Sequence, residues 1–163
     1  MRTTPAIYIA AILAIAACSK ASGNSDVPDT SPTAPLASRA DKQDIQWGPA
    51  PPSLPPGAQI AVLEGDPGGT GTFTLRLKLP NGYKIAPHTH PTVENLTILA
   101  GNFATGMGTQ FDESKLQANG RDAFVSLPAE HAHFAMARGE TVVQVHGLGP
   151  FVINYVNQTN TTR

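Results

Sequence analysis

The sequence has one cysteine, few charged residues and no run of lysine or arginine. The single cysteine, Cys18, has no partner within the chain, so an intramolecular disulfide is excluded. Only 14% of the 163 residues are charged, and the formal net charge is −1. Because no basic patch can be assembled, neither a nucleic acid nor an anionic membrane surface is an expected partner. The 40% hydrophobic content is also too high for a chain that is disordered throughout.

No apolar run is long enough to cross a bilayer core, which needs roughly 20 residues. The apolar stretch at residues 6–17 follows Arg2 and ends in small residues before Cys18, which is the order of a secretory signal peptide. Ile15-Ala16-Ala17-Cys18 resembles the lipobox of bacterial lipoproteins. The resemblance implies a signal peptide over residues 1–17, a lipidated Cys18 and, with Ser19 next, a location on the periplasmic face of the outer membrane. The alternative is an ordinary signal peptide beside an unrelated cysteine.

The segment after Cys18 is poor in large side chains. Residues 18–44 contain Val27 and Leu36 as their only large aliphatics, too few to offset the entropy lost on ordering. This composition predicts a flexible tether, followed by one folded domain over residues 45–157 and a tail over residues 158–163. Residues 48–57 include five prolines and predict an extended lead-in to the domain.

The predicted domain is built from short strands. Residues 73–79 alternate apolar and polar side chains with a strict period of two. Further strands are predicted around Leu96 and Ile98, around Val125 and Leu127, and over residues 141–145 and 151–156. Turns are predicted at residues 80–82 and at Arg138-Gly139, and one short helix over residues 112–119 with Asp112 as N-cap. This pattern predicts an all-β sandwich or barrel.

All five histidines lie in the second half of the chain, and two of them alternate along a predicted strand. His88 and His90 leave the same face of a strand, and Glu94 follows across Pro91, which can turn the carboxylate back toward them. Imidazole and carboxylate ligands suit Fe, Mn, Ni, Zn or Cu better than calcium or magnesium. A solvated surface pair is the alternative for a His-x-His pair taken by itself.

The spacing of these residues resembles the first motif of the cupin superfamily. Gly82, His88-x-His90, Glu94 and Gly101 fill its fixed positions. A second stretch, residues 128–133, resembles the second cupin motif, in which a histidine lies five residues after a proline; Pro128 and His133 match it. Asp122 and Glu130 stand where that motif has glycines, and Ala137 where it has asparagine.

The resemblance implies a single antiparallel, jelly-roll-like β-barrel around one divalent transition metal. His88, His90, Glu94 and His133 are the implied ligands, which would leave two coordination positions for a bidentate substrate, water or dioxygen. Glu94 is also a candidate catalytic proton shuttle. Two functions are compared: a metal-dependent enzyme, oxygenase-like, acting on a small oxygen-rich molecule, and a non-catalytic small-molecule or metal-binding module. A third candidate is a structural protein whose barrel serves mainly to form a homodimer.

Several other residues are assigned by strand parity alone. His131 shares the parity of His133 and is a candidate substitute ligand or proton carrier, against a partly exposed histidine near the mouth of the barrel. Gln144 and His146 share one face of a strand and line the pocket if that face points inward; a hydrogen-bonded structural histidine is the alternative. The expected core residues are Phe103, Met107, Phe124, Phe134 and Met136.

Overall fold

The computed structural model describes Arg39 and residues 41–157. The predicted signal peptide, Cys18, nearly all of the tether and the tail over residues 158–163 lie outside the described residues. Lys42–Asp44, at the end of the predicted tether, forms a single 3-10 turn. None of the helices in the described part of the chain is long and apolar enough to span a membrane.

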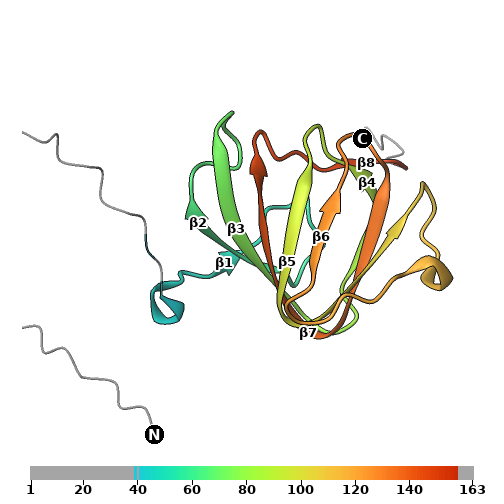
Figure 1. Ribbon diagram of the computed structural model, residues 1–163, viewed down its shortest axis with the longest axis horizontal. Coiled ribbons are helices and arrows are strands. Elements are labelled where there is room, and N and C mark those ends of the chain that lie inside the picture. Colours follow the sequence, from blue (N-terminus) through green and yellow to red (C-terminus); the bar gives the residue numbers. More distant parts are fainter. Residues whose placement is uncertain (1–38, 40, 158–163) are drawn as a thin grey trace, which may run out of the picture. The chain divides into compact units, whose positions relative to one another are not determined.

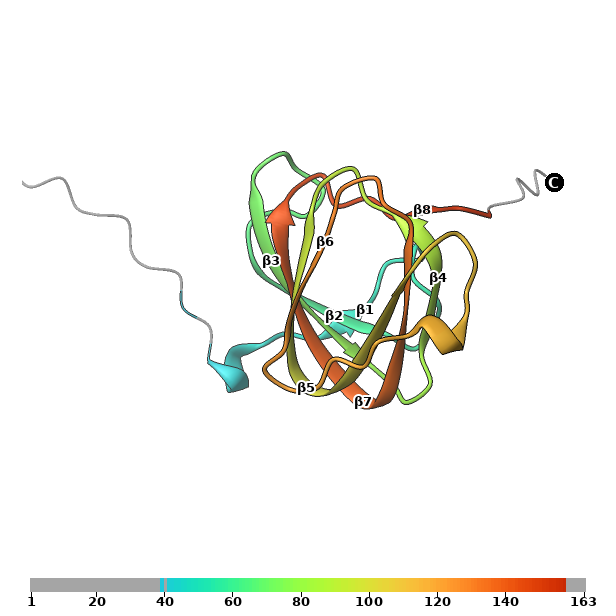
Figure 2. The same cartoon turned by 45° about the vertical axis from the view of Figure 1, so that its right-hand side comes forward.

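The described residues form one antiparallel sheet that curls into a half-barrel (Figures 1 and 2). The strand order is β1-β2-β3-β7-β4-β8, and β5 pairs with both β7 and β6. The predicted all-β barrel fold is therefore confirmed. The strands are β1 (Gly48–Pro49), β2 (Gln59–Glu64), β3 (Thr72–Leu79), β4 (Lys84–Thr89), β5 (Glu94–Met107), β6 (Phe124–Leu127), β7 (His133–Leu148) and β8 (Asn154–Tyr155).

Two long strands connect the parts of the sheet. β7 pairs with β4 through its first half, with β3 through its second half, and with β5 along most of its length. The predicted turn at Arg138-Gly139 is wrong, because the chain continues there as β7. Gly139 has φ +80°, and Gly101 on the paired strand has φ +74°, close to two shifts of register. These glycines bend the paired strands without reversing them.

The core lies on the concave face of the curled sheet. The predicted alternation of β3 is confirmed, with Phe73, Leu75, Leu77 and Leu79 all buried. β5 and β7 contribute buried residues with the same period of two. These residues are Leu96, Ile98, Val143 and Val145.

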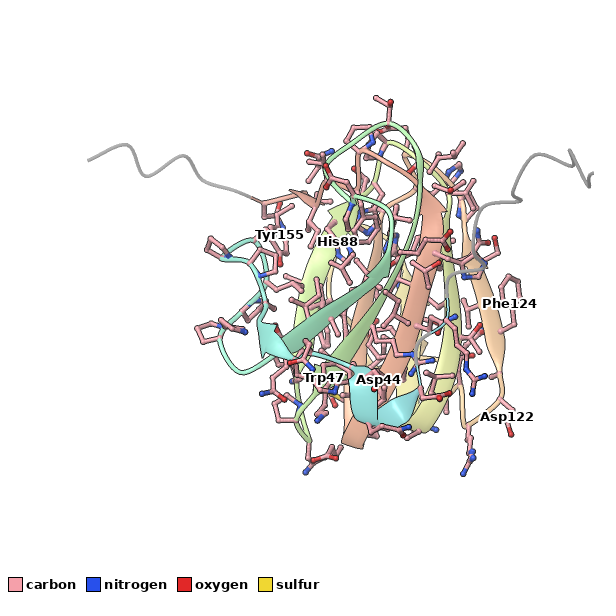
Figure 3. The ribbon with its side chains drawn as sticks, turned by 90° about the vertical axis from the view of Figure 1, so that its left-hand side faces the viewer. Asp44, Trp47, His88, Asp122, Phe124 and Tyr155 are labelled. Atoms are coloured by element: carbon pink, nitrogen blue, oxygen red, sulfur yellow. The ribbon has the colours of Figure 1, made fainter. Side chains whose placement is uncertain are left out.

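Two of the expected core residues are not in the core. Phe103 and Phe134 are buried and Met136 is half-buried, but Met107 is 46% exposed and Phe124 is 60% exposed. Phe124 alternates with Val125 and Leu127, so it lies on the convex face of β6 and projects from the sheet in Figure 3. The side of the sheet on which Phe124 lies follows from its place in the alternation along β6 and not from its hydrophobicity.

The helix predicted over residues 112–119 is reduced to the 3-10 turn η2 (Glu113–Lys115). Asp112 caps this turn as predicted, because its carboxylate accepts a hydrogen bond of 2.9 Å from the backbone N–H of Ser114. Beyond the turn, Gln117 and Gly120 form isolated bridges to β5. Pairing with the edge of β5 therefore replaces the remaining turns of the predicted helix.

Candidate metal centre

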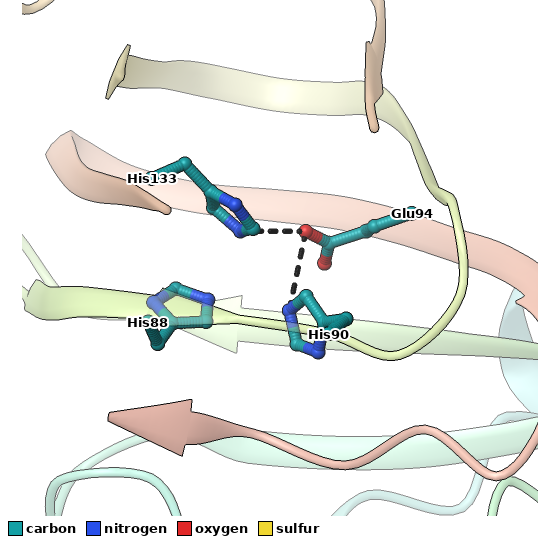
Figure 4. A group of neighbouring side chains, drawn as sticks. All are labelled: His88, His90, Glu94 and His133. Carbon is teal, nitrogen blue, oxygen red and sulfur yellow. Dashed lines mark ion pairs between the residues drawn. The ribbon is translucent and has the colours of Figure 1, made fainter. Parts of the chain in front are cut away.

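The four predicted ligands lie where the ends of three strands meet (Figure 4). His88 is on β4 and His90 follows its last residue, Glu94 begins β5, and His133 begins β7. His88 and His133 are direct cross-strand partners. All four side chains are buried, and one ligand atom from each lies within 4.8 Å of the others. Three strands thus bring together residues that are up to 45 positions apart (133 − 88 = 45).

A bulge in β4 directs His88 into this cluster. The register between β4 and β7 shifts between Ile85 and His88, so both side chains face the interior although they are separated by two residues. Pro87 lies inside the shift, a position where the missing N–H of proline costs no ladder hydrogen bond. The backbone carbonyl of Ala86 then faces the ring of His88, with the oxygen 2.7 Å from Nδ1.

Each of the three imidazole rings is held by a backbone carbonyl at Nδ1. The partner of His90 is Val152, at 2.7 Å, and the partner of His133 is the carbonyl of His131, at 2.9 Å. Since a carbonyl oxygen only accepts, Nδ1 carries the hydrogen in all three rings and Nε2 keeps its lone pair. Fixed tautomers of this kind are what metal-ligating histidines require.

The lone pairs converge on a position that lacks a hydrogen-bond donor. Nε2 of His133 lies 3.3 Å from the carboxylate of Glu94, and Nε2 of His90 lies 3.5 Å from the same oxygen. Both nitrogens are buried without a hydrogen-bond partner. Buried acceptors facing each other are unfavourable unless a proton or a cation lies between them. The donor set, three neutral imidazoles and a carboxylate, fits a divalent transition metal.

Burial and mutual charge keep the cluster in the protonation state that binds metal. Burial, followed by the charge of His133, lowers the pKa of His88 to about 4. Burial also lowers the pKa of His90, against the opposing effect of Glu94. For Glu94, burial acts to raise the pKa, but the effect of the nearby imidazoles outweighs it, so its pKa is lowered. His88 and His90 are therefore neutral and Glu94 is ionised at neutral pH.

These pKa values predict an acid-labile fold for the metal-free protein. The unfolded chain binds a proton at His88 near pH 6.5, whereas the folded chain does not until about pH 4. The free energy of unfolding should therefore fall as the pH drops from 6.5 to 4, by about 3 kcal/mol from this residue. The pKa of Glu94 is also lowered in the folded chain, so protonation of this residue at still lower pH reduces the free energy of unfolding further. Urea unfolding across this pH range measures the slope.

A matched pair of variants isolates that contribution. His88→Gln should reduce the slope between pH 6.5 and 4, and His131→Gln, at an exposed site outside the cluster, is the matched control. A wild-type unfolding free energy that is constant over this interval would contradict the assignment.

The two residues that replace motif glycines adopt the backbone conformation of glycine. Asp122 has φ +66° and Glu130 has φ +59°, the only non-glycine residues with positive φ in the described part of the chain. Both are fixed by backbone hydrogen bonds of 2.8 Å, from Asp122 N–H to the carbonyl of Ile98 and from Glu130 N–H to that of His90. The second bond connects the loop before His133 directly to His90. The local turn is thus kept despite the substitutions.

The other predicted pocket residues lie away from the cluster. His131 is exposed and its Nδ1 is 2.9 Å from the carbonyl of Ala129. Gln144 and His146 alternate with the buried Val143 and Val145, so they lie on the convex face and not on the inward face that would have let them line the metal pocket. Gln144 accepts a hydrogen bond of 3.0 Å from Arg76 on that face.

Two aromatic residues that no sequence motif indicated lie against the cluster. The ring of Phe151 stacks on His90, with centroids 4.4 Å apart and planes inclined by 14°. Tyr155 pairs with His88 across β4 and β8, and Figure 3 shows the two side by side. Phe151 and Tyr155 thus both lie in the stretch over residues 151–156 that was predicted only as a strand. Phe151 is identifiable only from the fold, since no spacing rule relates it to His90.

A cavity of about 100 Å³ adjoins the cluster and is lined in part by His88, His90 and Glu94. The proline-rich segment over residues 50–57, here termed the strap, closes one side through Pro51, Ser53 and Leu54. On the side of His133 the interior is nearly filled, with a space of about 20 Å³ among Leu, Phe, Ala, Val and Ile side chains. The space next to the cluster that can hold a small molecule is therefore the cavity between the cluster and the strap.

Solved structures with the same fold are cupin superfamily proteins and share little sequence with this chain. An acetylacetone dioxygenase from Acinetobacter johnsonii is 16% identical, with a TM-score of 0.58, over 82% of this chain and 85% of its own. The polyketide cyclase RemF from Streptomyces resistomycificus is 13% identical, with a TM-score of 0.58, over 77% and 89%. An RmlC-like cupin from Shewanella frigidimarina is 8% identical, with a TM-score of 0.52, over 73% and 91%. At these identities the similarity establishes the fold alone.

No curated protein matches the chain. A family profile described as "Domain of unknown function (DUF4437)" matches residues 11–154, which include every strand of the half-barrel except the last residue of β8. The match covers most of the 163 residues and all four residues of the cluster. The chain therefore belongs to the DUF4437 family and has a cupin-type fold.

Proposed function

We propose that this protein is a metal-dependent oxygenase of the cell envelope. His88, His90, Glu94 and His133 would hold one divalent transition metal, and the adjoining cavity would present a small oxygen-bearing molecule to it. The observation that carries this proposal is the pair of buried Nε2 atoms, on His90 and His133, that face a carboxylate with no donor between them. A bound divalent ion would supply Lewis-acid or oxygen chemistry at that position.

The residues of the chain have separate roles in this proposal. The carbonyls of Ala86, His131 and Val152 fix the imidazole tautomers, so the ligands are oriented before any metal arrives. Among the described residues that line the cavity, Glu94 is the only one with a carboxylate, so it is the group that can take a proton from a bound molecule. Phe151 and the strap exclude water from the cavity side of the cluster.

A non-catalytic binding module is a second candidate, and one observation favours it. Among the described residues, the cavity wall offers no acid or base besides His88, His90 and Glu94, all of which are proposed ligands. His131 and His146 lie elsewhere. An enzyme of this design would have to use a ligand for proton transfer, whereas a binding protein needs no such group.

Turnover separates the two candidates. Metal-loaded protein should be screened against neutral dicarbonyl and hydroxycarbonyl compounds, with dioxygen uptake and product formation as readouts; one solved structure of similar fold is an acetylacetone dioxygenase. We expect uptake that depends on one compound and falls at least about 100-fold in Glu94→Gln. Saturable stabilisation by a compound without any product would instead favour the binding module.

The envelope location is proposed from the sequence around Cys18. A lipidated Cys18 followed by the tether would hold the domain at the periplasmic face of the outer membrane, with the lipid as its only membrane contact. Cys18→Ala should lose the acyl mass and leave the membrane fraction. Wild-type protein that is released soluble and carries no added lipid mass would contradict this anchor.

A further inference from the structure

The cavity beside the cluster has an apolar wall. Apart from His88, His90 and Glu94, the one polar residue among the described residues that line it is Ser53. The rest are proline, aliphatic residues and one aromatic ring. Leu54, Ile60, Leu75, Leu77, Ile85 and Phe151 form most of this wall. No lysine or arginine among the described residues lines the cavity.

This wall excludes a charged ligand body. A carboxylate or phosphate placed away from the cluster would be desolvated without a cation to pair with, at a cost of several kcal/mol. A hydrocarbon body gains about 25 cal/mol for each Å² of apolar surface that it removes from water. The cavity therefore favours a ligand whose oxygen atoms face the cluster and whose remaining part is uncharged.

The volume of the cavity sets the size of that ligand. Apolar cavities of about 150 Å³ accommodate benzene. A cavity of about 100 Å³ therefore admits a molecule of about four or five non-hydrogen atoms. Longer chains would have to displace part of the wall.

The strap is the part of the wall that limits the length of the ligand. Leu54 is 8% exposed and packs into the core from the strap, while the prolines around it are exposed. Two tyrosine hydroxyls fix the strap, Tyr83 donating to the carbonyl of Pro55 at 2.5 Å and Tyr155 to that of Ser53 at 2.8 Å. Burial raises the pKa of Tyr83 to about 12, so this donor stays protonated at neutral pH.

We infer that the cavity selects compact, uncharged molecules with a bidentate oxygen head and a short hydrocarbon body, and that Leu54 sets the limit on length. This inference rests on the proposed metal at His88, His90, Glu94 and His133. Leu54 acts as a specificity-determining residue, because truncating it extends the cavity toward the strap without altering any of the four ligands.

The experiment measures binding, not turnover. Full-length protein loaded with metal is titrated by calorimetry with three hydroxamic acids that share one bidentate head: acetohydroxamic acid, octanohydroxamic acid and malonic monohydroxamate. We expect acetohydroxamic acid to bind at least about tenfold more tightly than either of the others. Leu54→Ala should reduce its advantage over the long chain at least about fivefold.

Two further variants keep the result interpretable. Leu54→Val, a smaller change, should shift the length preference in the same direction by less, so the test remains available if the alanine variant unfolds. Val62→Ala truncates an exposed aliphatic residue of β2 that does not line the cavity, and should leave all three affinities unchanged.

The possible failures differ in what they overturn. Wild-type protein that retains no metal would overturn the proposed function and this inference together. Protein that retains metal but binds the three compounds equally, or binds none of them, would overturn the inference alone. A length preference that persists in both Leu54 variants would remove the role of Leu54.

Discussion

His133→Ala is expected to lower metal affinity at least about 100-fold, while His131→Ala leaves it at the wild-type level. The two histidines are two residues apart and share strand parity, yet only His133 lies in the buried cluster. His131 is exposed, and it contributes to the cluster through its backbone carbonyl, which an alanine retains. Metal content after dialysis against a mild chelator measures the difference.

His88→Ala and His90→Ala should behave like His133→Ala, and circular dichroism should verify that each variant is folded. Loss of metal in His131→Ala together with full occupancy in His133→Ala would reverse the assignment of the fourth ligand. Full occupancy in every variant would remove the metal site from these residues.

Gly101→Ala should destabilise the domain by about 3–5 kcal/mol. Gly101 has φ +74°, and a Cβ at this position would overlap the carbonyl oxygen of Glu140 and lie 2.6 Å from Oγ1 of Thr141. These atoms belong to β7 at the bend of the two long strands, so they cannot move without disturbing the ladder. The loss of unfolding free energy in urea is the measurement.

Gly82→Ala is the matched control for this prediction. Gly82 has a similar φ of +76°, but a Cβ there meets nothing within 4 Å. Its substitution should cost only the backbone conformation, about 1 kcal/mol. If both variants lose the same free energy of unfolding, the close contact between a Cβ at position 101 and β7 does not contribute to the destabilisation.

The cluster was predictable because its four residues match the two cupin motifs, and the resemblance implies that both motifs contribute ligands to one metal. Local spacing alone indicated only that His88 and His90 leave the same face of an extended segment. The bulge at Pro87 was not predictable, since it depends on how β4 pairs with β7. For Gln144 and His146 the sequence left the direction of their face open, because parity shows only that two residues share a face. The face that becomes concave is the one that carries Val143 and Val145, because these side chains are buried where β7 lies between β3 and β5.

The strap and the turns show a second limit. Proline content indicated an extended segment over residues 48–57, but its return over the cavity depends on the distant hydroxyls of Tyr83 and Tyr155. Likewise, positive φ at Glu130 is maintained by a hydrogen bond to His90, 40 residues earlier (130 − 90 = 40). Contacts between residues so far apart in sequence cannot be read from local propensity.

Elemental analysis of the protein purified from its own cell envelope tests the metal centre most directly. The arrangement of His88, His90, Glu94 and His133 predicts about one divalent transition metal per chain, retained against a mild chelator and lost in His90→Ala. A folded wild-type protein that contains no transition metal as isolated, and takes up none when Fe, Mn, Ni, Zn or Cu is supplied, would contradict it.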